Sequence, residues 1–421
     1  MYYIKNPTSP SMGNACIILK SACLKHNTDS ENYGIMSAMK TIALFSENAR
    51  EYGRQFLKGV AHYALGRRNW RLRLLSPGEI GNRRAFAGVD GIIARIIGEE
   101  YIAQLKATGL PVVDAFCELD DPALIGVDND HTAIGKMAAE YFMQRGFRSF
   151  AYCGYRGTRY SDNRLAAYSA ALRHAGFPCA EFAVHEPPTN AIFFNEEAKP
   201  PRNNAKLRKW VAALPPRTAV FCANDLRAYH VLCAAQEIGR GVPDDLAVLG
   251  VDNDDLLCSY ASVAISSIDP NAFGVGHAAA RLMDAALSHP ERPKARPTFK
   301  VKPGTLVERT STAVFPVDPP WFATALSYIE THMSSPVSTV DAARAAGVSQ
   351  TALQTAFHAN FGMSAGKYIR GVKMREARRL IATSELSVKE IAARTGFVSH
   401  PHFSRTYRAH FGLPPSHPVS D

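Results

Sequence analysis

The sequence has no uninterrupted apolar run close to the roughly 20 residues that a membrane-spanning helix needs. It also lacks the longer apolar stretch of a secretory signal, since the N-terminal region has only a short apolar patch at 16–19. The eight cysteines include no Cys-x-x-Cys pair and lie mostly inside apolar segments, which indicates buried free thiols and not a disulfide scaffold. These absences exclude a membrane protein and predict a cytoplasmic one.

Acidic residues are fewer than basic ones, and the imbalance is concentrated in one part of the chain. There are 48 Lys and Arg against 38 Asp and Glu, a net charge of +10. Residues 321–421 hold eleven basic and six acidic residues, so half of the net charge lies in the last quarter. A basic module of this kind is typical of nucleic-acid binding, although mildly basic surfaces are also common without it.

The length of 421 residues predicts two or three domains at roughly 100–200 residues each. Residues 1–38 show no periodicity and are interpreted as a disordered extension or a misplaced start. Strand-like and helix-like segments alternate over 41–312, and 313–320 is a proline-rich linker. Residues 321–415 have a purely helical pattern.

The region 41–312 has the pattern of an α/β protein. Short apolar runs occur at 41–46, 70–76, 88–96, 111–116, 148–155, 218–224 and 246–253. Amphipathic stretches of 10–18 residues separate most of them, which predicts parallel sheets covered by helices on both faces. The region is too long for one simple sheet, so two similar lobes are expected, the second starting near Arg148.

The C-terminal region contains an internal repeat with the features of a helix-turn-helix. Segments 339–362 and 388–412 align with offsets of 49 and then 50 residues, so the second copy has one extra residue in its turn. In each copy a glycine ends the first helix (Gly347, Gly396) and a serine caps the second (Ser349, Ser399). Two copies joined by a basic helix at 365–383 indicate DNA binding more specifically than one copy would.

This repeat resembles the AraC/XylS family of transcription regulators, with Phe361–Ser364 matching the family's F-G-x-S pattern and Lys373 in place of its usual arginine. The resemblance implies two helix-turn-helix units that enter successive major grooves of a double-stranded DNA operator. Glutamine can bond adenine, threonine can contact the thymine methyl group, and arginine can bond guanine or clamp a phosphate. The predicted DNA-binding residues are Gln350, Thr351, Gln354, Thr355, Ser399, His400, His402, Arg405 and Arg408.

Polar residues that follow predicted strands of the larger region suggest a ligand site. Arg164 opens a helix, Asn224 and Asp225 end one strand, and Asp252 ends the next. Since the carboxyl ends of parallel strands meet at a crevice, these side chains have the chemistry to bind the hydroxyl groups of a sugar. Each residue taken alone is as well explained as a helix cap.

The same region resembles the sugar-binding domains of the LacI/GalR type, which are periplasmic-binding-protein-like. Arg164, Asn224 and Asp252 fall where that family places its sugar contacts, and the resemblance adds Tyr52 and Arg54 in the first helix. LacI relatives carry their DNA-binding unit at the N-terminus, whereas here an AraC-type unit lies at the C-terminus. The combination implies a homodimeric activator of sugar catabolism that works with RNA polymerase, with D-xylose as the first candidate effector.

Other functions remain as alternatives. A repressor responding to another sugar has the same sequence features, because the sign of regulation depends on where the operator lies. A non-catalytic solute-binding module would need an export signal and no DNA unit. An enzyme is not expected, since the sequence has no phosphate-binding loop or nucleophile elbow, and no cofactor is expected either. The spacing of His400 and His402 is compatible with a metal, but Pro401 and the lack of a nearby cysteine or carboxylate argue against one.

Overall fold

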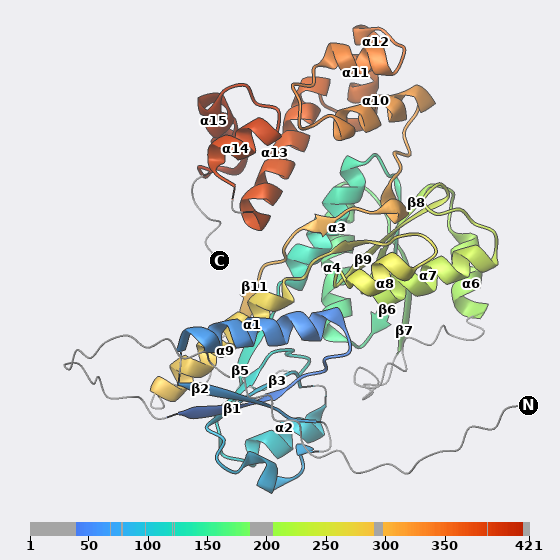
Figure 1. The fold of residues 1–421 in the computed structure, drawn as a ribbon. Helices are drawn as coiled ribbons and strands as arrows, with labels where there is room; N and C mark the ends of the chain where they lie inside the picture. The colour runs from blue at the N-terminus through green and yellow to red at the C-terminus, as the bar shows by residue number, and fades with distance from the viewer. Residues whose placement is uncertain are drawn as a thin grey trace, which may run out of the picture. The chain divides into compact units, whose positions relative to one another are not determined.

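A computed structural model gives the fold of most of the chain (Figure 1). The structure describes residues 39–67, 69–76, 79–96, 98–119, 121, 123–185, 205–289, 298–384 and 386–415. The predicted extension at 1–38 lies outside these residues. Two six-stranded sheets with covering helices precede a helical C-terminal part, which confirms the predicted fold class. No helix in the described part of the chain is long and apolar enough to cross a membrane.

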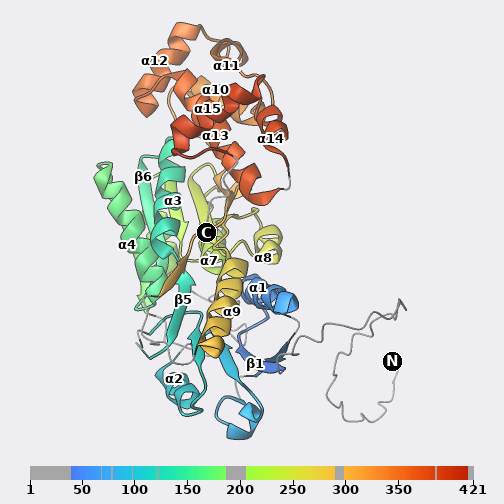
Figure 2. The ribbon, with the colours of Figure 1, turned by 90° about the vertical axis from the view of Figure 1, so that its left-hand side faces the viewer.

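The first lobe is a parallel sheet with the strand order β11-β5-β4-β3-β1-β2. Its strands are β1 (Lys40–Phe45), β2 (Trp70–Leu74), β3 (Gly91–Ala94), β4 (Val112–Asp114), β5 (Ile125–Asn129) and β11 (Phe299–Val301). Helices α1 (Glu51–Arg67) and α9 (Ala272–Ser288) lie on one face and α2 (Glu99–Lys106) lies on the other (Figure 2). Side chains of β1 alternate between two apolar cores, with Ile42 and Leu44 in one and Ala43 and Phe45 in the other.

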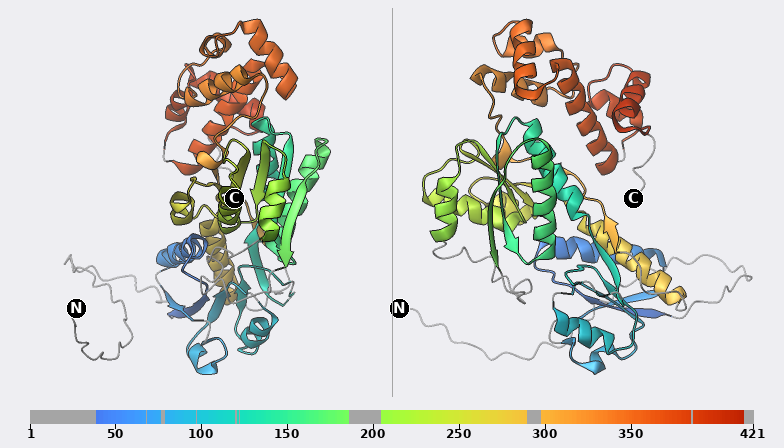
Figure 3. Two further views of the ribbon diagram at one scale, coloured as in Figure 1. Left: turned by 90° about the vertical axis from the view of Figure 1, so that its right-hand side faces the viewer. Right: turned by 180° about the vertical axis from the view of Figure 1, so that it is seen from behind.

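The second lobe has the strand order β12-β10-β9-β8-β6-β7. Its strands are β6 (Ser149–Arg156), β7 (Ala180–His185), β8 (Thr218–Cys222), β9 (Leu246–Val251), β10 (Ser266–Ile268) and β12 (Leu306–Val307). Only the pairing of β10 with β12 is antiparallel. Helices α3 (His131–Gln144) and α4 (Arg159–His174) cover one face, while α6 (Ala205–Ala213) and α7 (Asp225–Glu237) cover the other (Figure 3). The short helix α8 (Asp255–Tyr260) follows β9.

The strands of the second lobe begin with β6 at Ser149, next to the predicted start at Arg148, but the two lobes are not consecutive in sequence. The chain returns to the first lobe after β10, because α9 packs on α1 and β11 pairs with β5. Small residues permit this packing: a Cβ atom at Gly59 or at Gly276 would lie 2.0 Å from a carbonyl oxygen of the facing helix. Three chain crossings therefore connect the lobes: β5 to α3, β10 to α9, and β11 to β12.

The C-terminal part consists of six helices in its described residues. They are α10 (Pro320–Thr331), α11 (Thr339–Ala345), α12 (Gln350–Phe361), α13 (Ala365–Thr383), α14 (Val388–Arg394) and α15 (His400–Phe411). The predicted repeat is confirmed as two helix-turn-helix units, α11–α12 and α14–α15, joined by α13. Ser349 and Ser399 cap α12 and α15, and Gly347 and Gly396 have φ angles of 67° and 66°. Leu353 and Phe357 in one unit, and Phe403 and Tyr407 in the other, are buried as predicted.

Candidate effector cavity and DNA-reading helices

A cavity lies where the carboxyl ends of strands from both sheets meet, the usual place for a ligand in parallel α/β folds. Its lining residues are Glu47, Arg50, Tyr52, Arg95, Phe116, Asp128, Asn129, His131, Tyr160, Arg164, Asn224 and Asp252. Twelve side chains from both lobes thus surround one space, seven of them charged or potentially charged. The cavity is the candidate effector site.

Four of the six predicted effector residues lie in this cavity: Tyr52, Arg164, Asn224 and Asp252. Asn224 is also the N-cap of α7, where its side chain accepts a hydrogen bond from the Arg227 amide. Asn224 therefore caps a helix and lines the cavity at the same time.

Asp225 and Arg54, also predicted as effector contacts, do not line the cavity. Asp225 is the first residue of α7, and its buried carboxylate accepts hydrogen bonds from the Ser267 hydroxyl (2.6 Å) and the Asp254 amide (2.9 Å). Arg54 donates to Glu51 (2.8 Å) and to the Ala49 carbonyl (2.6 Å). Arg50, one helical turn earlier, lines the cavity instead.

The sequence reading missed Asp128, Asn129 and His131, which enter the cavity from the end of β5 and the start of α3. A signal was present, because the pentapeptide Gly-Val-Asp-Asn-Asp at 250–254 also occurs at 126–130. No repeated motif marks the other lining residues that the sequence did not predict. They follow strands or lie at the start of a helix: Glu47, Arg95, Phe116 and Tyr160.

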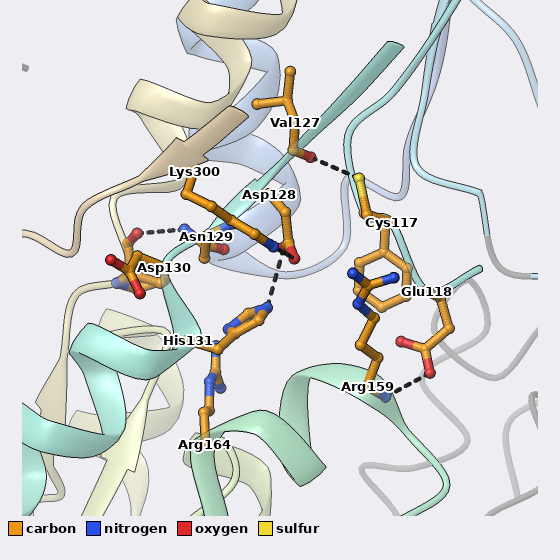
Figure 4. A network of polar contacts seen from close by, with 12 residues as sticks. Cys117, Glu118, Val127, Asp128, Asn129, Asp130, His131, Arg159, Arg164 and Lys300 are labelled. Carbon is orange, nitrogen blue, oxygen red and sulfur yellow. Dashed lines mark hydrogen bonds and ion pairs between the residues drawn. The ribbon is translucent and has the colours of Figure 1, made fainter. Parts of the chain in front are cut away.

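Two carboxylates of the cavity are each neutralised by their own cation. Glu47 pairs with Arg95 at 2.8 Å, and the Arg95 guanidinium lies over the Tyr52 ring at 4.4 Å. Asp128 lies between Lys300 (2.8 Å) and the Nε2 atom of His131 (3.1 Å), as Figure 4 shows. Burial opposes the ionisation of Asp128, but the bonds from His131 and Lys300 outweigh it and hold its pKa below the ordinary value.

His131 and Arg164 present unpaired polar atoms to this region. Burial lowers the pKa of His131, so the ring is neutral and the bond to Asp128 assigns its proton to Nε2. His131 Nδ1 and Arg164 Nε are buried and have no hydrogen-bond partner among the described residues. The Arg164 guanidinium donates to the Ala223 carbonyl and lies over the Tyr160 ring at 5.1 Å. Both residues line the cavity, and the guanidinium group of Arg164 can donate hydrogen bonds to a ligand.

Asp252 is the carboxylate of the cavity that is left without a hydrogen bond to its side chain in the described part of the chain. Its backbone has a φ of 115°, which a residue with a side chain rarely adopts and which is common at functional sites. Burial raises the pKa of Asp252 to about 6, against the lowering effect of Arg164, Arg50 and Arg95. Asp252 is therefore free to accept hydrogen bonds from a ligand.

The predicted DNA-binding residues lie on the second helix of each helix-turn-helix unit or cap it. Exposed among them are Gln350, Thr351, Thr355, Ser399, His400, His402, Arg405 and Arg408. Gln354 is half-buried, because its carbonyl accepts a hydrogen bond from the Ala365 amide at the start of α13. No group of three His, Cys, Asp or Glu side chains with the geometry of a metal site occurs among the residues that the structure describes.

Comparison with known proteins finds a family match within each of the two parts of the chain. Residues 139–312 match the family described as a periplasmic binding protein-like domain, and residues 342–418 match a helix-turn-helix domain family. The xylose operon regulatory protein of Escherichia coli K12 is 25% identical over 385 residues, which cover 88% of this chain and 94% of that protein.

Two solved structures share the fold. One, described as a xylose-binding transcription activator, superposes with a TM-score of 0.55 at 23% identity and covers 90% of this chain and 98% of that one. The other is a LacI family regulator of Enterococcus faecium with bound ribose, with a TM-score of 0.51 at 20% identity, covering 65% of this chain and 98% of that one. The two domains and the relatives aligned over most of their length make the chain a sugar-responsive, DNA-binding transcription regulator and not an enzyme.

Proposed function

We propose that this regulator activates genes of sugar catabolism and that its effector is D-xylose, bound in the cavity between the two lobes. The relatives support this choice, since one is named for the xylose operon and a solved structure is described as a xylose-binding activator. We further propose that it acts in the cytoplasm as a homodimer that recruits RNA polymerase.

The observation that carries the proposal is the balance of charge in the cavity. The lining contains three arginines (Arg50, Arg95, Arg164) and three carboxylates (Glu47, Asp128, Asp252). Glu47 and Asp128 already have protein partners, so Arg164 and Asp252 remain as a donor and an acceptor for a ligand. A neutral polyhydroxyl ligand matches this arrangement, because its hydroxyl groups both donate and accept.

The proposed mechanism couples the cavity to the DNA-binding part through closure of the lobes. A ligand that contacts both lobes stabilises the closed state, and it shifts the equilibrium only if it binds that state more tightly. The lining residues Asp252 and Asn224 belong to the second lobe, and Asp128 and Tyr52 belong to the first. One ligand in the cavity can therefore contact both lobes. The reading helices α12 and α15 then engage two half-sites, with Arg405 as the proposed guanine or phosphate contact.

Titration of the full-length protein with D-xylose tests the proposal, with L-arabinose and D-ribose as matched pentoses. At 100 times its Kd, D-xylose is expected to stabilise the protein by about 2.7 kcal/mol and to change its affinity for operator DNA. Each pentose is measured by thermal unfolding and by gel shift. A protein that responds equally to all three sugars, or to none, contradicts the xylose assignment.

A further inference from the structure

A buried lysine lies in the middle of α13, the helix that joins the two helix-turn-helix units. Lys373 is 7% exposed and has no carboxylate partner in the described part of the chain. Its Nζ atom donates to the carbonyls of Ser335 and Gly396, each at 3.1 Å, and lies 5.6 Å from the centre of the Phe397 ring. Burying an ammonium group is costly unless it is hydrogen-bonded, so this arrangement needs both carbonyls in place. A side chain directed inward in this way cannot reach a DNA phosphate.

One of the two carbonyls belongs to the second helix-turn-helix unit, and the other belongs to the segment that leads into the first. Ser335 lies between α10 and α11, in front of the first unit, whereas Gly396 lies in the turn between α14 and α15 of the second. The backbones also meet directly, because a Cβ atom at Gly396 would lie 2.2 Å from the Ser335 oxygen and 2.7 Å from Lys373 Nζ. Lys373 thus connects the turn of the second unit to the segment that leads into the first.

The first unit provides a natural comparison. Gly347 occupies the equivalent place in its turn and has a φ of 67°, against 66° for Gly396. A Cβ atom at Gly347 would meet nothing within 4 Å. Both glycines therefore have a positive φ that favours glycine. Of the two, only Gly396 is also in close contact with Ser335 and Lys373.

We propose that Lys373, held by the Ser335 and Gly396 carbonyls, is a positioning residue that fixes the spacing and rotation of α15 relative to α12. This inference rests on one part of the proposed function, namely that the reading helices α12 and α15 bind the same DNA. One added base pair moves a half-site by about 3.4 Å and rotates it by about 35° around the helix axis. A rigid connection between the units makes binding sensitive to such a change, and a loose one does not.

The test uses full-length protein and a site that it selects from random DNA. Variants are Lys373→Met and Gly396→Ala, with Gly347→Ala as the control for the strain of alanine at positive φ. Binding is measured to the selected site, to sites with one base pair added or removed between the half-sites, and to a site whose second half is scrambled. Thermal unfolding shows whether each variant is folded. If Lys373→Met does not fold, Gly396→Ala tests the same contact from the turn.

We expect the wild type and Gly347→Ala to lose about tenfold in affinity when the spacing changes by one base pair. Lys373→Met and Gly396→Ala are expected to bind the three spacings within about threefold of one another, at an affinity close to that for the single half-site. The positioning role is overturned if Lys373→Met still loses about tenfold in affinity when the spacing changes by one base pair. It is also overturned if Lys373→Met loses about tenfold in affinity for the site with one scrambled half. If the wild type binds the site with a scrambled second half as tightly as the selected site, the two units do not both bind DNA. That result would overturn the proposed DNA mechanism.

Discussion

Two copies of one pentapeptide, Gly-Val-Asp-Asn-Asp, end in the same kind of helix cap but differ in backbone conformation and in partners. Asp252 and Asn253 have φ angles of 115° and 47°, whereas Asp128 and Asn129 lie within β5. Both copies, 126–130 and 250–254, include the end of a buried parallel strand, and both end in an aspartate that caps the next helix. Asp130 accepts a hydrogen bond from the Ala133 amide (2.9 Å), and Asp254 accepts one from the Leu257 amide (3.2 Å). The fifth position of the motif therefore caps a helix in both lobes.

The third position differs. Asp128 is bonded to Lys300 and His131, whereas Asp252 has no hydrogen bond to its side chain within the described residues. The pentapeptide itself contains no information on this difference, because Lys300 lies on β11, far along the chain. A short motif thus predicts the strand end and the cap, and the tertiary fold determines which carboxylate is left for a ligand.

The largest effect is expected at the unpaired carboxylate. Asp252→Asn removes a charged acceptor, and loss of hydrogen bonds to a charged group costs about 1.5–3 kcal/mol, or about 10- to 150-fold in affinity for D-xylose. Isothermal titration measures the affinity. Because burial disfavours the charged form of Asp252, the variant is expected to unfold at no lower temperature than the wild type without sugar. Unchanged xylose affinity in a folded Asp252→Asn protein would remove Asp252 from the site.

The pH dependence of D-xylose binding is a second test of whether the Asp252 carboxylate contacts the sugar. The pKa of Asp252 is raised to about 6, and a proton on the carboxylate competes with the hydroxyl groups that it would accept. Affinity for a neutral sugar is therefore expected to be constant above pH 7 and about tenfold lower at pH 5. The control is Asp252→Asn, whose profile is expected to lose this step. An identical step in the variant would assign the titration to another group, such as His131.

The sequence predicted the strands and helices that have strong patterns, together with four of the residues that line the cavity. β1, β8 and α13 were predicted within two residues of their observed ends, since apolar runs and amphipathic periods are local properties. The return of α9 and β11 to the first lobe was not predictable in this way, because strand pairing depends on contacts between distant segments. For the same reason Asp225 was expected in the cavity: its position beside Asn224 says nothing about the Ser267 hydroxyl that binds it.

A smaller effect on binding is expected at the paired carboxylate. Asp128→Asn keeps the shape of the side chain but weakens its bonds to Lys300 and His131, which is expected to lower the free energy of unfolding by about 1–3 kcal/mol. The affinity for D-xylose is expected to change by no more than about threefold, since Asp128 is already occupied by protein partners. Urea unfolding and calorimetry measure the two quantities. If Asp128→Asn weakens xylose binding as much as Asp252→Asn, the distinction between the two copies is wrong.

The smallest effects on the free energy of unfolding are expected at the fifth positions. Asp130→Ala and Asp254→Ala each remove a helix cap, at a cost of about 1 kcal/mol in the free energy of unfolding. Asp254 has a further role, because its other oxygen accepts a hydrogen bond from the Glu51 amide (3.2 Å), which lies at the start of α1 in the first lobe. Asp130→Ala is therefore expected to leave the affinity for D-xylose unchanged, whereas Asp254→Ala also removes a contact between the lobes and is expected to lower it by about two- to fivefold. Equal xylose affinities in the two variants would show that the contact with Glu51 does not stabilise the form that binds sugar.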